Sequence, residues 1–170
     1  MDVFEAISQR RSIRTYKNTQ IEEKKLRKVL EAARLAPSAS NRQEWKFIVV
    51  RDPTKRAELV GMTYGQQWVG EAPAIIVACA TESRLIMTCG QATHTVDVSI
   101  ACTMMILEAW EQGLGTCWLG TFNETDVKKC LGIPTNMRVV TIIPLGYPNE
   151  APLPRPRKPF DQIVSFDFYK

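Results

Sequence analysis

Apolar residues recur at helical spacing in two long stretches of this chain. In the first, between Thr19 and Leu35, they alternate with Glu and Lys, and Thr19 followed by Glu22 has the pattern of a capping box. In the second, between Gln91 and Gln112, they cover most of the helix circumference instead of one stripe. We therefore predict an amphipathic helix over the first stretch. The second is predicted as a helix buried on nearly all sides, at the centre of the fold or at a subunit interface.

Shorter helices are predicted from their end signals. Asp2, followed by Glu5 three residues later, predicts a capping-box helix over Val3–Gln9. Phe4 and Ile7 are expected on its inner face. Two more helices are predicted from Pro53, after Asp52, and over Glu124–Leu131, between Asn123 and Gly132.

Short uninterrupted apolar runs predict buried strands. The predicted strands are Trp45–Val50, Ala74–Ala80, Gly115–Gly120 and Arg138–Leu145. A proline-rich stretch, Pro152–Pro159, cannot be helical and is predicted as an extended strap. The alternation of apolar residues in Phe160–Tyr169 suits an added strand at the C-terminal end.

The segment Gly61–Gly70 has no clear period and carries aromatic residues between glycines. Two interpretations of it stay open. Tyr64–Trp68 is either a mobile cover over a ligand or a set of core or interface anchors.

Composition narrows the class of protein. The chain has 170 residues, of which 45% are hydrophobic and 24% charged, as in an ordinary globular protein. We expect a single domain over 1–170, with a core over 1–150 and a C-terminal extension over 151–170. The formal net charge of +4 comes from basic residues that are too dispersed for a nucleic-acid stripe. We predict no nucleic-acid partner, although a basic nucleic-acid binder is kept as an alternative.

Five cysteines, widely spaced and without a Cys-x-x-Cys pair, accompany a single histidine. This pattern predicts neither a metal site nor a disulfide framework. No apolar run reaches the roughly 18 residues that span a bilayer, and no signal pattern is present. We therefore expect a cytoplasmic protein without a membrane partner. Cys117 and His94 are interpreted as structural residues.

The densest local chemistry lies in Arg10-Arg11-Ser12-Ile13-Arg14. Its three guanidinium groups are planar donor forks that match a phosphate or a carboxylate. Taken alone, the segment is more simply a solvated basic turn.

Five segments in order resemble the FMN-dependent nitroreductase family, over nearly the whole chain. They are Arg10–Arg14, Ala36–Trp45, Gly113–Gly120, Leu145–Pro148 and Arg155–Pro159. The chain departs from the family at Glu44, where proline is usual, and this leaves the rigidity of that loop open.

The resemblance implies a phosphate clamp made from both ends of the chain. Arg10 would hold the FMN phosphate together with Arg155 and Arg157 of the strap. The fold would have to bring these residues together, because they are far apart in sequence. Among the arginines of the cluster, Arg11 is the least well supported as an FMN ligand, and its expected role is an added contact along the ribityl-phosphate arm.

By the same resemblance, Ser12 contacts the ribityl chain, and Arg14 lies beside the N1 and C2 carbonyl edge of the ring, where a cation stabilises the reduced flavin. The glycine-bounded segment approaches the ring with backbone N–H groups near N5, although Trp118 is alternatively a core aromatic. Arg14, Leu119 and Gly120 are the predicted catalytic positions. The remaining predicted cofactor-binding residues are Pro37, Ser38, Ala39, Asn41, Gln43 and Trp118.

The implied fold is α+β, a three-layer α/β/α sandwich around a mostly antiparallel sheet. The implied assembly is a homodimer with FMN at the subunit interface and the C-terminal strap exchanged between subunits. The implied reaction is ping-pong hydride transfer from NAD(P)H through flavin N5 to a nitroaromatic or a quinone. Reductive dehalogenation, oxidative flavin cleavage and a flavin-binding redox module without turnover are the alternatives.

Overall fold

The computed structural model describes residues 2–169 and has an α+β fold around a four-stranded sheet. The strand order is β1-β2-β4-β3, and every neighbouring pair is antiparallel. The strands are β1 (Trp45–Val50), β2 (Ala74–Ala80), β3 (Gly115–Thr116) and β4 (Arg138–Gly146). The predicted antiparallel sheet is therefore confirmed.

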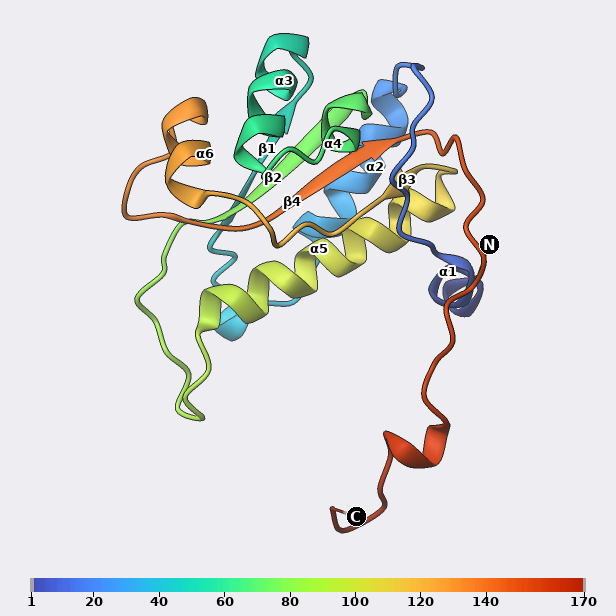
Figure 1. Cartoon of the computed structure of the whole chain (residues 1–170). Helices are drawn as coiled ribbons and strands as arrows, with labels where there is room; N and C mark the ends of the chain where they lie inside the picture. Colours follow the sequence, from blue (N-terminus) through green and yellow to red (C-terminus); the bar gives the residue numbers. More distant parts are fainter. Residues whose placement is uncertain (1, 170) are drawn as a thin grey trace.

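Helices cover both faces of the sheet (Figure 1). One face is covered by α2 (Glu23–Arg34) and α5 (Thr93–Glu111), and the other by α3 (Pro53–Met62), α4 (Trp68–Glu71) and α6 (Glu124–Leu131). The remaining helix, α1 (Val3–Gln9), lies near the end of α5. The predicted three-layer α/β/α arrangement is confirmed.

The central strand β2 shows how the sequence builds these layers. Ile76 and Ala78 pack into the core under α2 and α5, whereas Ile75 and Val77 pack into the core under α3, α4 and α6. Successive side chains of a strand point to opposite faces, so a strand that is covered on both sides is apolar at every position. All residues of β2 are buried.

The start of α2 differs from the prediction. The helix begins at Glu23, and the residue before it, Glu22, makes no side-chain cap hydrogen bond. The capping box at Thr19 does not form because the chain there runs along the end of β4, where the Lys17 N–H donates to the Tyr147 carbonyl at 2.9 Å. The Tyr147 hydroxyl in turn donates to the Glu22 carboxylate at 2.5 Å. Tertiary contacts therefore override the local cap signal.

The capping box of α1 is present, but its predicted inner face is wrong. Phe4 and Ile7 are 76% and 51% exposed, whereas Ala6 is buried. The small Ala6 side chain lets α1 lie against α5, and the two large side chains project from the chain.

The long helix α5 is confirmed, with a predicted boundary two residues early at its start. It is not buried on all sides of one chain. Thr103 is exposed, and Met104 and Glu108 line an open groove of about 1140 Å³ between α5 and α2.

Two predicted strands are wrong or only partly formed. Only Gly115–Thr116 of the predicted Gly115–Gly120 strand belongs to the sheet, with a further isolated bridge at Leu119. Phe160–Tyr169 forms no strand; its first residues make a 3-10 turn, Phe160–Gln162. Figure 1 shows the reason, because the C-terminal segment leaves the body of the fold and has no strand beside it.

No helix in the part of the chain that the structure describes is long and apolar enough to cross a bilayer.

Candidate active site

Residues 10–16, which we call the arginine strip, run in an extended conformation along the ends of β3 and β4. Ser12 forms a parallel bridge with Thr116, and Tyr16 forms an antiparallel bridge with Pro148. The Ile13 N–H donates to the Thr116 carbonyl at 2.9 Å. The sheet therefore fixes the position of the backbone that carries the arginine side chains.

Two apolar side chains of this strip fit against glycines of other segments. Ile13 is fully buried, and a Cβ on Gly115 would come within 2.6 Å of its Cγ1 atom. A Cβ on Gly146 would lie 2.5 Å from Pro73 and 3.1 Å from the Tyr16 ring. These glycines are thus required for close packing of the strip.

The buried Tyr16 fixes the same strip from within. Its hydroxyl donates to the Ile13 carbonyl at 2.6 Å, and burial raises the pKa of Tyr16 far above its ordinary value. The tyrosine is therefore a neutral anchor that donates a hydrogen bond.

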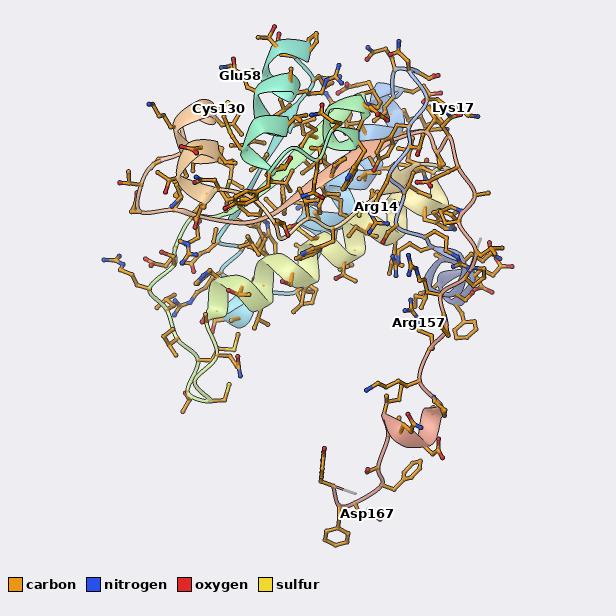
Figure 2. All side chains as sticks on the ribbon, viewed as in Figure 1. Arg14, Lys17, Glu58, Cys130, Arg157 and Asp167 are labelled. Atoms are coloured by element: carbon orange, nitrogen blue, oxygen red, sulfur yellow. The ribbon has the colours of Figure 1, made fainter. Side chains whose placement is uncertain are left out.

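Both ends of the chain meet in one pocket of about 750 Å³. Figure 2 shows Arg157, which belongs to the strap, beside α1. The residues with charged or hydroxyl groups that line the pocket are Ser8, Arg10, Arg11, Ser12, Arg14, Glu150, Arg155 and Arg157. The structure thus brings together the arginines that the sequence places at opposite ends of the chain.

The arginines of the pocket differ in how they are used. The Arg11 Nη1 atom donates to the carbonyls of Ser8, Gln9 and Arg10 at 2.9, 2.8 and 2.9 Å, so this guanidinium caps the C-terminal end of α1. Arg14 stacks over Trp68, with 5.8 Å from the guanidinium carbon to the ring centroid.

The three arginines of the predicted clamp are free to bind an anion. Arg10, Arg155 and Arg157 make no ion pair or side-chain hydrogen bond within residues 2–169, since none of the bridges found there involves them. Three unpaired guanidinium groups around one pocket suit a phosphate dianion. The residues present therefore fit the FMN phosphate.

The segment from Trp118 to Gly120 follows directly from the bridge between Thr116 and Ser12, but it does not line this pocket. Leu119 is buried, and its N–H donates to the Ile142 carbonyl at 3.0 Å. Its N–H is therefore already used. Trp118 is 39% exposed, and the space where a Cβ of Gly120 would stand is open. Leu119 and Ile142 exchange both backbone hydrogen bonds, so the N–H groups of the neighbouring residues 118 and 120 point away from β4.

The amide-rich loop, residues 36–44, lies elsewhere. The Ala39 N–H donates to both carboxylate oxygens of Asp97, at 3.2 Å each, in the first half of α5. Ser40, Asn41 and Gln43 all have left-handed backbones, with φ of 53°, 54° and 55°. Such residues are strained unless their surroundings hold them, and they cluster at functional sites.

Asp97 was not among the site residues predicted from the sequence. It is only 4% exposed, and its carboxylate receives the backbone of the predicted flavin loop. The available signal was an acid between Val96 and Val98 in the apolar first half of α5, because a carboxylate is rarely buried without a partner.

Within one chain the structure does not bring the loop of Pro37, Ser38, Ala39, Asn41 and Gln43 to the arginine pocket. The loop lies near the start of α5, and the arginine strip lies near its end (Figure 1). A helix of 19 residues is about 28 Å long. The two halves of the predicted site are therefore separated by most of the length of α5.

Cys117 and Trp68 lie close to the arginine strip, and their surroundings fit a structural role. Burial raises the pKa of the Cys117 thiol, although Arg14, a hydrogen bond from Ser12 and the charge of Arg10 act in the opposite direction. Trp68 packs against the buried cluster of Ile13, Tyr16 and Ala72, whereas Tyr64 is 73% exposed. The Tyr64–Trp68 segment thus combines a core anchor with an exposed ring.

Comparison with known proteins agrees with this geometry. A family model described as the nitroreductase family matches residues 7–82 and 61–147. A protein of Thermus thermophilus named NADH dehydrogenase is 30% identical over 201 residues, covering 96% of this chain and 95% of the relative. A protein of Bacillus subtilis named FMN reductase [NAD(P)H] is 25% identical over 185 residues, covering 99% of this chain and 74% of the relative.

A solved structure shows the same fold. The crystal structure of a nitroreductase family protein from Clostridium novyi superimposes with a TM-score of 0.84 at 34% identity, covering 88% of this chain and 87% of that one. The family model and these relatives together span the arginine strip, the amide-rich loop and the sheet between them, and on this evidence the chain belongs to the nitroreductase family.

Proposed function

We propose that this chain is an FMN-dependent oxidoreductase that takes hydride from NAD(P)H and passes it to an electron-poor acceptor, a nitroaromatic or a quinone, in a ping-pong cycle. The observation that carries the proposal is the arginine pocket, in which three unpaired guanidinium groups from both ends of the chain converge. The FMN reductase and NADH dehydrogenase names of two relatives support the same class of reaction.

In the proposed site, Arg10, Arg155 and Arg157 hold the phosphate, and Ser12 contacts the ribityl chain. Arg14 supplies a positive charge at the pyrimidine edge of the ring, and its stacking on Trp68 restricts its direction. Trp118 and Gly120 offer outward-facing backbone N–H groups. Bound FMN supplies the two-electron carrier, and the side chains bind it, orient it and tune its potential.

The proposal includes a homodimer in which each site uses two chains. The amide-rich loop and the arginine strip lie near opposite ends of α5, so an antiparallel pairing of two α5 helices would place the loop of one chain beside the strip of the other. The strap and the C-terminal residues that follow it carry apolar side chains that one chain leaves uncovered, among them Leu153 (86%), Phe166 (74%) and Phe168 (77%). Exchange of the strap between subunits beyond Arg157 would bury the two phenylalanines, while Arg155 and Arg157 stay in the pocket of their own chain.

The first test is the absorbance spectrum of the purified protein. We expect the bands of oxidised FMN, either as purified or after reconstitution with FMN. Steady-state oxidation of NADH and of NADPH, each with nitrofurazone and with menadione, then measures turnover and nucleotide preference. For a ping-pong cycle, plots of reciprocal rate against reciprocal nucleotide concentration are expected to give parallel lines at different acceptor concentrations.

Different failures point to different alternatives. Colourless protein that cannot be reconstituted with FMN contradicts the whole proposal and favours a basic nucleic-acid binder. Bound FMN that neither nucleotide reduces contradicts the reductase activity and favours a flavin-binding module. Rapid flavin reduction without turnover of either acceptor contradicts the acceptor class alone and favours another reaction of this fold.

A further inference from the structure

One acidic residue lines the arginine pocket among the residues that the structure describes. Glu150 lies in the same pocket wall as Arg10, Arg14, Arg155 and Arg157. A carboxylate there opposes the binding of any anion, because like charges repel. Its presence therefore requires a role other than contact with the ligand.

The contacts of Glu150 point to such a role. Its Oε1 atom accepts hydrogen bonds from the backbone N–H groups of Arg14 and of Thr15, the second at 3.0 Å. These residues are separated from Glu150 by 136 and 135 positions in the sequence. A carboxylate that receives two backbone N–H groups makes charge-assisted hydrogen bonds, which are stronger than neutral ones.

Glu150 also completes a short ladder between the two ends of the chain. The Asn149 N–H donates to the Thr15 carbonyl at 2.9 Å, and the Lys17 N–H donates to the Tyr147 carbonyl at 2.9 Å. The ladder starts at Tyr147 and ends at Glu150, where the side chain replaces a backbone partner.

Beyond Glu150 the strap is not tied to the fold by its backbone. Residues 151–158 make no backbone hydrogen bond within the described part of the chain, and the prolines at 152, 154 and 156 have no N–H to donate. Glu150 is thus the last attachment before the strap arginines, Arg155 and Arg157. Its hydrogen bonds set the point from which both guanidinium groups reach the pocket.

We propose that Glu150 is a positioning residue, a latch that holds the start of the strap against the arginine strip so that both halves of the phosphate clamp face one pocket. The proposal rests on the proposed FMN site for its effect on cofactor binding. The latch and simple electrostatics predict opposite changes in FMN affinity when the carboxylate is removed. Removal of a carboxylate from a cationic pocket should tighten FMN binding by charge alone, whereas removal of a latch should weaken it.

Two substitutions separate these effects. Glu150→Ala removes both the charge and the acceptor, and we expect it to raise the FMN dissociation constant on the order of tenfold. Glu150→Gln removes the charge but keeps a side-chain oxygen, so we expect FMN to bind as tightly as in the wild type or more tightly. Fluorescence titration of FMN measures both. Unchanged or tighter binding in Glu150→Ala would overturn the latch, as would equal weakening in the two variants.

The matched control is Glu58→Ala, which removes one exposed carboxylate on α3, far from Arg157 (Figure 2). We expect FMN affinity equal to the wild type in this variant. Thermal unfolding of all variants checks that the fold is intact, and Glu150→Gln serves as the conservative variant that must rescue binding.

A second measurement tests the latch without FMN. Trypsin does not readily cleave before proline, so Arg155 and Lys158, each followed by proline, leave the Arg157–Lys158 bond as the tryptic site of the strap. In cofactor-free full-length protein we expect faster cleavage of this bond in Glu150→Ala than in the wild type or Glu150→Gln. Equal cleavage rates in all three would contradict the latch. If the wild type fails to bind FMN, the proposed function falls, and this measurement still decides the role of Glu150.

Discussion

Arg10 and Arg11 are adjacent in sequence, but their guanidinium groups have different roles. Arg11 caps three carbonyls at the end of α1, whereas the Arg10 side chain has no partner among the residues that the structure describes. We expect Arg10→Ala to weaken FMN binding by roughly 1.5 to 3 kcal/mol, since a charge-assisted pair is lost. Arg11→Ala should instead lower the free energy of unfolding by about 1 kcal/mol and leave FMN affinity nearly unchanged. FMN titration and urea unfolding of both variants would show the opposite pattern if Arg11 were the phosphate ligand.

Gly115 and Gly120 have equally separate roles, although both belong to the same glycine-bounded segment. A Cβ at Gly115 meets Ile13 at 2.6 Å, whereas a Cβ at Gly120 meets nothing within 4 Å. We expect Gly115→Ala to destabilise the fold by about 1 to 3 kcal/mol. Gly120→Ala should change stability by less than about 0.5 kcal/mol. Urea unfolding measures both, and comparable losses in the two variants would contradict the packing role of Gly115.

The site residues that could be predicted from the sequence stand in local motifs, and the ones that could not are defined by contacts with distant parts of the chain. Arg10, Arg155 and Arg157 stand in recognisable motifs, so a resemblance can assign them. Asp97 and Glu150 act through hydrogen bonds to residues far away in sequence, and neither carries a motif. Only the fold shows that one holds the amide-rich loop and the other holds the strap.

Elements were predictable where one local signal dominates. The Asn123 cap of α6 and the fully apolar β2 follow directly from the sequence. The start of α2 was mispredicted because Tyr147 and the end of β4 compete with the Thr19 cap. The C-terminal segment was mispredicted as a strand because alternation alone does not supply a neighbouring strand.

Glu124 couples α6 to β4 and makes the stability of this pair of elements pH-dependent. Its carboxylate accepts from the Val139 N–H and from Arg138, each at 2.9 Å, and lies 3.0 Å from the Lys128 ammonium. Burial alone would raise the pKa of Glu124, but these hydrogen bonds outweigh it and lower the pKa below its ordinary value of 4.5. A carboxyl with a lowered folded pKa stabilises the fold above its unfolded pKa and loses that contribution as the pH falls.

We therefore expect Glu124→Gln to lower the free energy of unfolding by about 1 kcal/mol at neutral pH. The difference from the wild type should shrink as the pH falls through the acidic range below 4.5. Urea unfolding as a function of pH measures this, with Asp126→Asn in the same helix as the matched control. A difference that is constant with pH would show that the carboxylate charge is not the cause.

At the scale of the whole molecule, the separation of the two half-sites along α5 predicts complementation between defective chains. Chains with Arg10→Ala lack part of the arginine strip, and chains with Asn41→Ala and Gln43→Ala lack part of the amide-rich loop. In a mixed dimer, one site combines the intact strip of the loop-defective chain with the intact loop of the strip-defective chain. The other site combines the two defective halves and carries all the substitutions. We therefore expect each homodimer to bind FMN weakly and the mixed dimer to regain one tight site.

Two different affinity tags on co-expressed chains isolate the mixed dimer, and FMN titration gives the number and affinity of its sites. The expected stoichiometry is one tightly bound FMN per mixed dimer, against two for the wild type. If strip and loop served the same site within a single chain, every site of the mixed dimer would carry a defect and none would bind tightly. The loop is held at Asp97 and the strip packs against Trp110, 13 residues or about 20 Å further along α5, so a small shift of the loop within one chain does not join the two halves. Recovery of a tight site in the mixed dimer would therefore come from the second chain.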